Sequence, residues 1–361
     1  MPVKYKNFTF DNHVIDVINN KNSQVAAHEF NEYLHHAHFA GKSVIEVLKD
    51  LRFNSNEIIR LPKEKNLNLS LEEQEKVVID FYTTLNAELG KKVEVIISKQ
   101  DNRYIYNFTS SRKCEGNTGF RGSSTKKIHI DVISDGSVLG LRMLAHELAH
   151  GISAEKTTAY NVTNNSGDVK SYFKRLGLFN VDSISEIETH IIEYLFMDYL
   201  LNCNIINQQD YNLFLQNRQS SFTKHLNTNI EESFVLDNLP RNFNMQDLEK
   251  FTNKLGKGII KSKKYHKIMK RLIFDFNRDP NKGYSQYDFR YVVGEIVSTN
   301  WYKQYLQSNT QEQQEMIKKF IDYLSKTDSL ELSDACKLLL NTSIGDTVTN
   351  YQQNMQNSNT I

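Results

Sequence analysis

The sequence is poor in cysteine, in proline and in net charge, and each shortage excludes a class of protein. It has 3 cysteines, Cys114, Cys203 and Cys336. They are far apart and odd in number, which argues against a disulfide framework and favours a reducing compartment. The 4 prolines fit a mostly helical fold, because proline interrupts helices. A formal net charge of +1 argues against nucleic acid or an anionic membrane as a partner.

The chain also lacks any long apolar run. No stretch approaches the length needed to span a bilayer, and residues 1–7 do not contain the apolar region of a signal peptide. We therefore expect a soluble, cytoplasmic protein without a membrane partner, with export by a specialised route as the alternative. The chain of 361 residues is long enough for one large domain or two modest ones. Its sequence gives no indication of the oligomeric state.

The most informative motif is His146-Glu147-Leu148-Ala149-His150, which is predicted to lie on a helix. Histidines four positions apart share one face of a helix, so both imidazoles can bind one ion. Glu147 is then placed to take a proton from a water molecule at that ion. Asp135 or Ser137 can cap the helix. The predicted buried stripe is Val138, Leu141, Leu144, Ala145, Leu148 and Ile152. The alternative is a core helix with two satisfied histidines.

A zinc hydrolase needs a third protein ligand, and a helix predicted at 183–197 is the candidate source. Its apolar face consists of Ile184, Ile187, Ile191, Tyr194 and Leu195. Another face carries Glu186, His190, Glu193 and Met197. We take Glu186 as the ligand, with His190 and Glu193 as groups that orient the ligands and His190 as a candidate catalytic residue. Glu188 or Glu193 could replace Glu186, and the alternative for the whole face is that it is solvated.

The remaining patterns predict an N-terminal helical region at 1–100 and a catalytic domain at 101–361. A capping box at Ser70 and Glu73 predicts the start of a helix that ends near Gly90. Strands are expected at 93–97, 104–108 and 127–132, with a glycine-rich loop at 112–124. Further helices are expected at 207–226, 229–238, 245–254, 258–276, 286–306, 310–325 and 331–340.

Three further segments are weighed as binding sites for a substrate, a phosphate group or a second metal ion. An edge strand near a metal can pair with an extended substrate, and residues 128–132 are the candidate strand. The glycine-rich loop has no Lys-Ser/Thr ending and no following helix, which argues against a phosphate site. A histidine cluster near the N-terminus is more typical of a polar surface than of a second metal site; it comprises His28, Glu32, His35, His36 and His38.

The helix expected at 286–306 carries two tyrosines, Tyr287 and Tyr291, on one face. A phenol is a neutral hydrogen-bond donor near neutral pH, and it can stabilise the oxyanion that develops at a peptide carbonyl. Both tyrosines are therefore candidate catalytic residues. The alternative is that they belong to an ordinary aromatic core.

Taken together, these motifs resemble the thimet oligopeptidase and oligoendopeptidase F family of zinc peptidases, over residues 104–352. In that family the zinc helix is followed by Glu-x-x-Ser-Gln-x-x-Glu, and Glu186 and Glu193 keep this spacing between the acids. The pattern Tyr287-x-Phe289-x-Tyr291-x-x-Gly294 is similar to the family's alternating tyrosines before a glycine. Weaker similarity covers 112–120, 323–329 and 338–346.

The resemblance implies a mainly α fold, a helical zinc-peptidase catalytic bundle with a small β-sheet beside the zinc helix. It also implies Zn²⁺ held by His146, His150 and Glu186, Glu147 as the general base, and a peptide or protein as substrate. The chain departs from the family at Ala149, where glycine is usual, and at Ser153, where histidine is frequent. Its N-terminal part is shorter, so a more open cleft is expected. The interval between His150 and Glu186 is longer, so an inserted loop near the cleft is expected.

Two other functions are weighed against a general peptidase. One is a toxin-like zinc endoprotease or secreted effector with one host protein target, which the small size favours. The other is a non-catalytic helical binding module with a structural or degenerate zinc site. Zinc content and cleavage of short peptides distinguish the three functions.

Overall fold

The structure, a computed structural model, is mainly α, as the sequence predicts. It describes residues 3–5, 8–10, 21–39, 41–54, 61–120, 127–164, 184, 186–237, 287–327 and 330–358. Two compact units are formed, one from residues 1–55, 222–292 and 352–361, and the other from residues 56–221 and 293–351. Both units are assembled from separate stretches of chain. The division into an N-terminal helical region at 1–100 and a catalytic domain at 101–361 stays a prediction.

The first unit contains two short antiparallel strand pairs and several helical segments. Strand β1 (Val3–Tyr5) pairs with β2 (Phe8–Phe10), and β3 (His38–Phe39) pairs with β4 (Lys42–Ser43). Helices α2 (Lys21–His36) and α3 (Val44–Asn54) flank the second pair. The predicted histidine cluster is divided between α2 and β3, and within the described residues it is not among the groups that could hold a metal ion. His36 pairs with Glu32, and His35 pairs with Asp237.

The second unit begins with two helices where one helix and a strand were predicted. Helix α4 (Leu71–Leu85) starts with the predicted capping box of Ser70 and Glu73. It ends at Asn86, whose extended backbone breaks the helix and whose side chain caps α5 (Ala87–Ile97). The prediction of a strand at 93–97 is therefore wrong. Val93 and Ile96 are buried in α5 at helical spacing, a pattern that short apolar runs share with strands.

Three strands form a mixed sheet in the order β5-β7-β6. The central strand β7 (Ile128–Ser134) pairs in parallel with β5 (Tyr104–Ser110) and antiparallel with β6 (Glu115–Phe120). Because β7 has a strand on both sides, the prediction that 128–132 is the free edge is wrong. The segment predicted as a loop contains β6 instead. Its sequence Gly-Asn-Thr-Gly has low strand propensity, so β6 depends on backbone pairing with β7.

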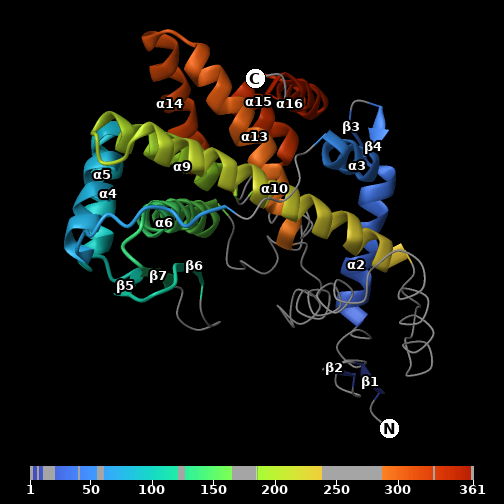
Figure 1. Ribbon diagram of the computed structural model, residues 1–361, viewed down its shortest axis with the longest axis horizontal. Helices are drawn as coiled ribbons and strands as arrows, with labels where there is room; N and C mark the ends of the chain where they lie inside the picture. Colours follow the sequence, from blue (N-terminus) through green and yellow to red (C-terminus); the bar gives the residue numbers. More distant parts are fainter. Residues whose placement is uncertain are drawn as a thin grey trace. The chain divides into compact units, whose positions relative to one another are not determined.

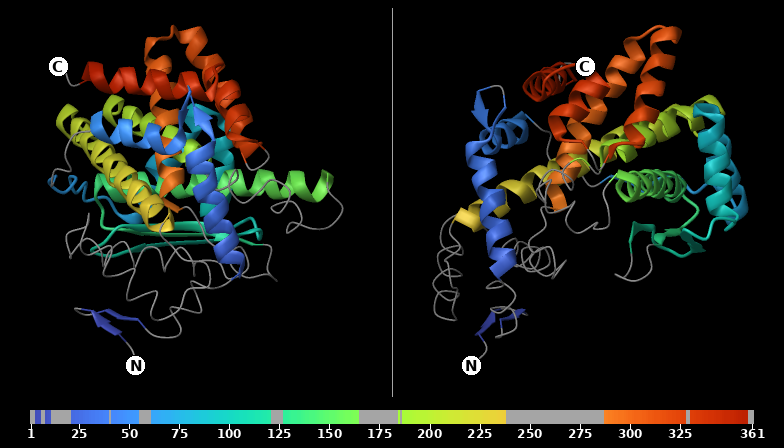
Figure 2. Two further views of the ribbon diagram at one scale, coloured as in Figure 1. Left: turned by 90° about the vertical axis from the view of Figure 1, so that its right-hand side faces the viewer. Right: turned by 180° about the vertical axis from the view of Figure 1, so that it is seen from behind.

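Helix α6 (Val138–Asn164) lies between this sheet and α9 (Ile187–Asn202), as Figures 1 and 2 show. Ser137 caps α6 by accepting a hydrogen bond from the Gly140 backbone N–H at 3.2 Å, as one of the two predicted caps. Each residue of the predicted apolar stripe is buried. The hydroxyl of Tyr82 on α4 donates to the Ala145 carbonyl at 2.7 Å. These contacts hold α6 in the centre of the unit.

The C-terminal part is helical, with α10 (Gln208–Asp237), α13 (Tyr287–Gln307), α14 (Thr310–Leu324), α15 (Leu332–Leu340) and α16 (Ile344–Ser358). Helix α10 is continuous over the two helices predicted at 207–226 and 229–238, and α16 was not predicted. The helices expected at 245–254 and 258–276 lie outside the described residues. No described helix is both long enough and apolar enough to cross a membrane.

The close packing of α6 on the sheet gives a testable prediction at Gly151. A Cβ atom at Gly151 would lie 2.4 Å from the Ile130 Cδ1 atom of β7. We expect Gly151→Val to lower the free energy of unfolding by about 1–3 kcal/mol, because it overpacks a buried contact. In an Ile130→Ala background the same change should cost less, by at least about 0.5 kcal/mol. Urea unfolding of the four proteins measures both effects, and equal costs in the two backgrounds would contradict this explanation.

Candidate metal centre

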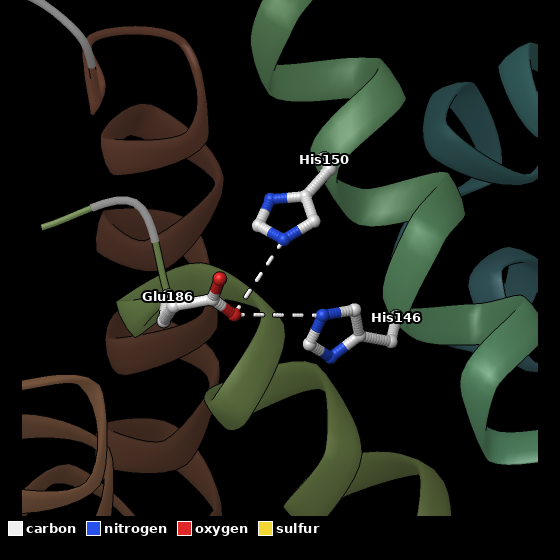
Figure 3. A group of neighbouring side chains, drawn as sticks. All are labelled: His146, His150 and Glu186. Carbon is white, nitrogen blue, oxygen red and sulfur yellow. Dashed lines mark ion pairs between the residues drawn. The ribbon is translucent and has the colours of Figure 1, made fainter. Parts of the chain in front are cut away.

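Helices α6 and α9 bring two histidines and a glutamate together in the second unit. His146 and His150 lie one turn apart on α6, and Glu186 is the residue that precedes α9. The Nε2 atom of His146 lies 3.5 Å from Glu186 Oε2, and the Nε2 atom of His150 lies 3.6 Å from the same oxygen. Figure 3 shows both rings directed at this carboxylate. Glu186 itself is only 1% exposed.

The spacing of these atoms fits a metal ion. Tetrahedral coordination with bonds of about 2.1 Å separates neighbouring ligand atoms by about 3.4 Å. The observed 3.5 and 3.6 Å are close to that value, and the three ligand atoms all lie within 4.8 Å of one another. Among the histidine, cysteine and acidic side chains of the described residues, His146, His150 and Glu186 lie close enough together to hold a metal ion.

Each histidine also has a carboxylate on its other ring nitrogen. His146 Nδ1 lies 2.8 Å from Glu193 Oε1, and His150 Nδ1 lies 3.3 Å from Glu188 Oε1. The two alternative ligands, Glu188 and Glu193, therefore face the nitrogens that point away from Glu186. Both are buried, so this face of α9 is not the solvated surface that was weighed as an alternative. Carboxylates at Nδ1 orient histidine ligands in many metal sites.

Glu147 lies beside the cluster and against the edge of the sheet. Its Oε2 atom is buried and has no hydrogen-bond partner among the described residues. The Thr118 hydroxyl of β6 donates to the Glu147 carbonyl at 3.0 Å. A Cβ atom at Gly116 of β6 would lie 2.5 Å from Glu147 Oε1. Strand β6 therefore approaches this glutamate closely because position 116 has no side chain.

Two buried arginines, which the sequence analysis missed, bind the carboxylate of Glu193. Arg142 Nη1 donates to Glu193 Oε2 at 2.8 Å, and Arg218 Nη1 donates to the same oxygen at 2.7 Å. Arg142 also pairs with Glu64 at 3.1 Å, and Arg218 also pairs with Glu295. Arg142 precedes His146 by one helical turn, so the spacing that identified His150 could have identified it. Glu64, Arg218 and Glu295 lie far from the motif in the sequence, and no spacing along the chain connects them to it.

These contacts shift the pKa values of three groups. Burial raises the pKa of Glu193, but Arg142 and Arg218 outweigh it and hold that pKa well below its usual value. Burial lowers the pKa of His150, but Glu186 and Glu188 outweigh it and raise that pKa well above its usual value. Burial and the charge of Arg218 lower the pKa of His190 well below its usual value, so this ring is neutral near neutral pH.

The buried acids outnumber the buried guanidinium groups around the cluster. The carboxylates belong to Glu64, Glu147, Glu186, Glu188, Glu193 and Glu295, and the guanidinium groups to Arg142 and Arg218. Buried negative charge is costly unless a cation balances it. A divalent ion beside Glu186 would offset part of this excess, which supports the fit that the distances indicate.

The other predicted site residues are placed less directly. His190 lies on α9, with its ring centroid 6.5 Å from that of His146 and its Nδ1 atom 3.6 Å from Glu295 Oε2. Tyr291 belongs to the first compact unit, where its ring stacks on His225 with 4.6 Å between centroids. The side chain of Tyr287 lies outside the described residues. The catalytic roles of these three residues stay predictions.

Comparisons with known proteins identify no family. No family model matches the chain, and no curated protein matches it. A crystal structure from Chlamydophila abortus, named "putative peptidase", is similar over 96% of this chain and 54% of that chain, with 12% sequence identity and a TM-score of 0.47. The chain thus spans about half the length of that protein.

Gly294 gives a prediction about the metal centre. A Cβ atom there would lie 2.9 Å from Glu186 Cβ and 3.0 Å from the Glu186 carbonyl oxygen. Because these atoms are close to the backbone that starts α9, Gly294→Ala should displace Glu186. We expect metal binding to weaken by about tenfold or more. Titration of metal-free protein with Zn²⁺ by calorimetry measures this.

The matched control for this prediction is Ser298→Ala, one turn further along α13. The Ser298 hydroxyl donates only to the Glu295 carbonyl of its own helix among the contacts described. We expect this variant to bind metal like the unmodified protein. Unchanged affinity in Gly294→Ala would contradict the close packing of α13 against Glu186.

Proposed function

We propose that this protein is a zinc-dependent metallopeptidase that hydrolyses peptide bonds of peptides or of a protein substrate. The supporting observation is one buried carboxylate oxygen opposite two histidine Nε2 atoms, with Oε2 of Glu147, which has no hydrogen-bond partner among the described residues, beside them. Two imidazoles and one carboxylate are a donor set typical of catalytic zinc, which leaves a position open for substrate or water. Calcium and magnesium prefer oxygen ligands throughout, so nitrogen donors favour zinc.

The residues of the centre divide the work between binding and proton transfer. When bound, zinc supplies Lewis acidity, which makes water acidic near neutral pH and polarises a peptide carbonyl. His146, His150 and Glu186 would hold the ion. Glu147 would accept a proton from the attacking water at its free oxygen and deliver it to the departing amine. This role needs a carboxylate that is not tied to another side chain, and Oε2 of Glu147 meets that requirement.

We further propose β6, in place of β7, as the strand that holds an extended substrate. An extended peptide can add to a sheet edge through main-chain hydrogen bonds. Among the described strands, β6 is the edge strand that contacts Glu147, through Thr118 and Gly116. A peptide beside it would present its carbonyl groups near the proposed base.

The assisting groups and the compartment are part of the same proposal. Tyr287 or Tyr291 would donate a hydrogen bond to the oxyanion, an effect worth about 3 kcal/mol for one donor. Neutral His190, whose ring lies beside that of His146, would help to orient the ligands. The cysteines Cys114, Cys203 and Cys336 are all free, which fits a cytoplasmic compartment.

Removal of the metal tests the function directly. We expect the purified protein to cleave members of a peptide library, as read by mass spectrometry. A chelator should abolish cleavage, and added Zn²⁺ should restore it, because the proposed reaction depends on the ion. Stoichiometric zinc without any cleavage would contradict a peptidase and favour a binding module. Cleavage of one folded protein without cleavage of short peptides would indicate an endoprotease with a single target.

Glu147→Gln tests the proposed base. The amide cannot accept the proton from water, so we expect kcat to fall by about 10²–10⁴-fold. Zinc content should stay at the level of the unmodified protein, because Glu147 is not a ligand in this proposal. Kinetics with a quenched peptide and metal analysis by mass spectrometry measure both properties. Turnover that survives the substitution would refute this role.

A further inference from the structure

We propose that Arg218 is a positioning residue of the metal centre, acting on His146 through Glu193 together with Arg142. The inference rests on the proposed function, because it assigns residues that prepare a zinc ligand. Arg218 lies on α10, far in sequence from both α6 and the start of α9. Its guanidinium reaches no proposed ligand directly in the contacts described, so its effect passes through the Glu193 carboxylate.

The two oxygens of Glu193 have different partners. Oε2 accepts hydrogen bonds from the guanidinium groups of Arg142 and Arg218, at 2.8 and 2.7 Å. An oxygen that accepts two such donors belongs to an ionised carboxylate, so Oε1 can only accept a hydrogen bond. Its partner at 2.8 Å is Nδ1 of His146, which must therefore carry the ring hydrogen. In the neutral ring, the lone pair of His146 then lies on Nε2, on the side of Glu186.

The guanidinium of Arg218 is held in one orientation. It bridges Glu193 on α9 and Glu295 on α13 through different nitrogen atoms. Its carbon atom lies 4.6 Å from the centre of the Tyr194 ring and 5.8 Å from that of Phe214. Arg142 contacts the same Phe214 ring at 4.9 Å, so Phe214 lies against both guanidinium groups. A guanidinium that lies over aromatic rings and bridges two carboxylates has a restricted orientation.

Lysine could not fully replace Arg218 in this arrangement. A guanidinium directs separate N–H groups at Glu193 and Glu295, whereas an ammonium is a compact charge on a flexible stem. Lysine keeps the positive charge and can reach one of the two carboxylates. A positioning role therefore predicts partial rescue by lysine, while a purely apolar packing role predicts rescue by a residue such as methionine.

The alternative is that Arg218 only joins helices α9, α10 and α13. Breaking a buried ion pair by removing one partner destabilises a fold whether or not a metal binds. Thermal stability therefore cannot separate the two roles. Zinc affinity and the geometry of the bound metal can, because only a positioning role changes the tautomer and orientation of His146.

The experiment compares Arg218→Met, Arg218→Lys and a matched control, Arg103→Met. Arg103 pairs with Asp101 in an exposed turn of the same unit, just before strand β5. The zinc dissociation constant is measured on metal-free protein by competition with a chromophoric chelator, and Co²⁺ substitution reports coordination by its visible spectrum. We expect Arg218→Met to weaken zinc binding by about 10–100-fold and to change the Co²⁺ spectrum. Arg218→Lys should recover part of the affinity, and Arg103→Met should match the unmodified protein.

If Arg218→Met has the same zinc affinity and the same Co²⁺ spectrum as the protein without a substitution, the inference is overturned and Arg218 has only a structural role. If Arg218→Met does not fold, Arg142→Met decides, because it removes the other donor from the same oxygen. Weakened zinc binding in that variant supports the inference, and unmodified binding overturns it. If the unmodified protein binds no zinc, the proposed function fails and the inference fails with it.

Discussion

Burial of acidic side chains on α9 is the constraint on which the rest of the second unit depends. Glu186, Glu188 and Glu193 are all enclosed, although a carboxylate without a partner is very costly in a protein interior. Helix α9 can occupy this place only because cationic or hydrogen-bonding groups meet each acid. The histidines of α6 and the arginines of α6 and α10 are those groups. The metal centre is thus part of how the helices pack.

The negative charge is balanced in two different ways. Glu193 is neutralised by Arg142 and Arg218, whose guanidinium groups remain charged at any pH at which the protein folds. Glu186 faces two imidazoles. An imidazole is a much weaker base than a guanidinium group, and its neutral form can bind a metal ion. One half of the cluster is therefore permanently paired and rigid. The other half has the donor atoms of a candidate metal site.

Glycines set the distances between the sheet and the helices that surround the candidate metal centre. Gly140 and Gly151 let α6 approach β7, and Gly116 lets β6 approach Glu147. Gly294 does the same for α13 beside Glu186. Larger residues at these positions would separate the sheet, α6, α9 and α13 by enough to change the geometry of the centre. The positions of Glu147 and Glu186 therefore depend on glycines that pack against them.

The sequence by itself determined the features that depend on neighbours along the chain. Helix α6, its cap at Ser137, its buried stripe and the common face of His146 and His150 all follow from helical spacing, which is a local property. The acid-rich helix follows from the same spacing, although it was predicted at 183–197 and α9 spans Ile187–Asn202, directly after Glu186. Where local signals compete, the predictions failed: Asn86 restarts a helix that was expected to continue, and an apolar run expected as a strand belongs to α5.

Only the tertiary structure decided which distant groups meet. The pairing that makes β6 a strand and β7 the central one comes from backbone hydrogen bonds across the sheet, which are insensitive to residue type. The contacts of Arg218 and Glu295 join helices that are remote in sequence, and an arginine in a helix has no local mark of its future partner. Local periodicity identifies the faces of helices, but packing decides what each face meets.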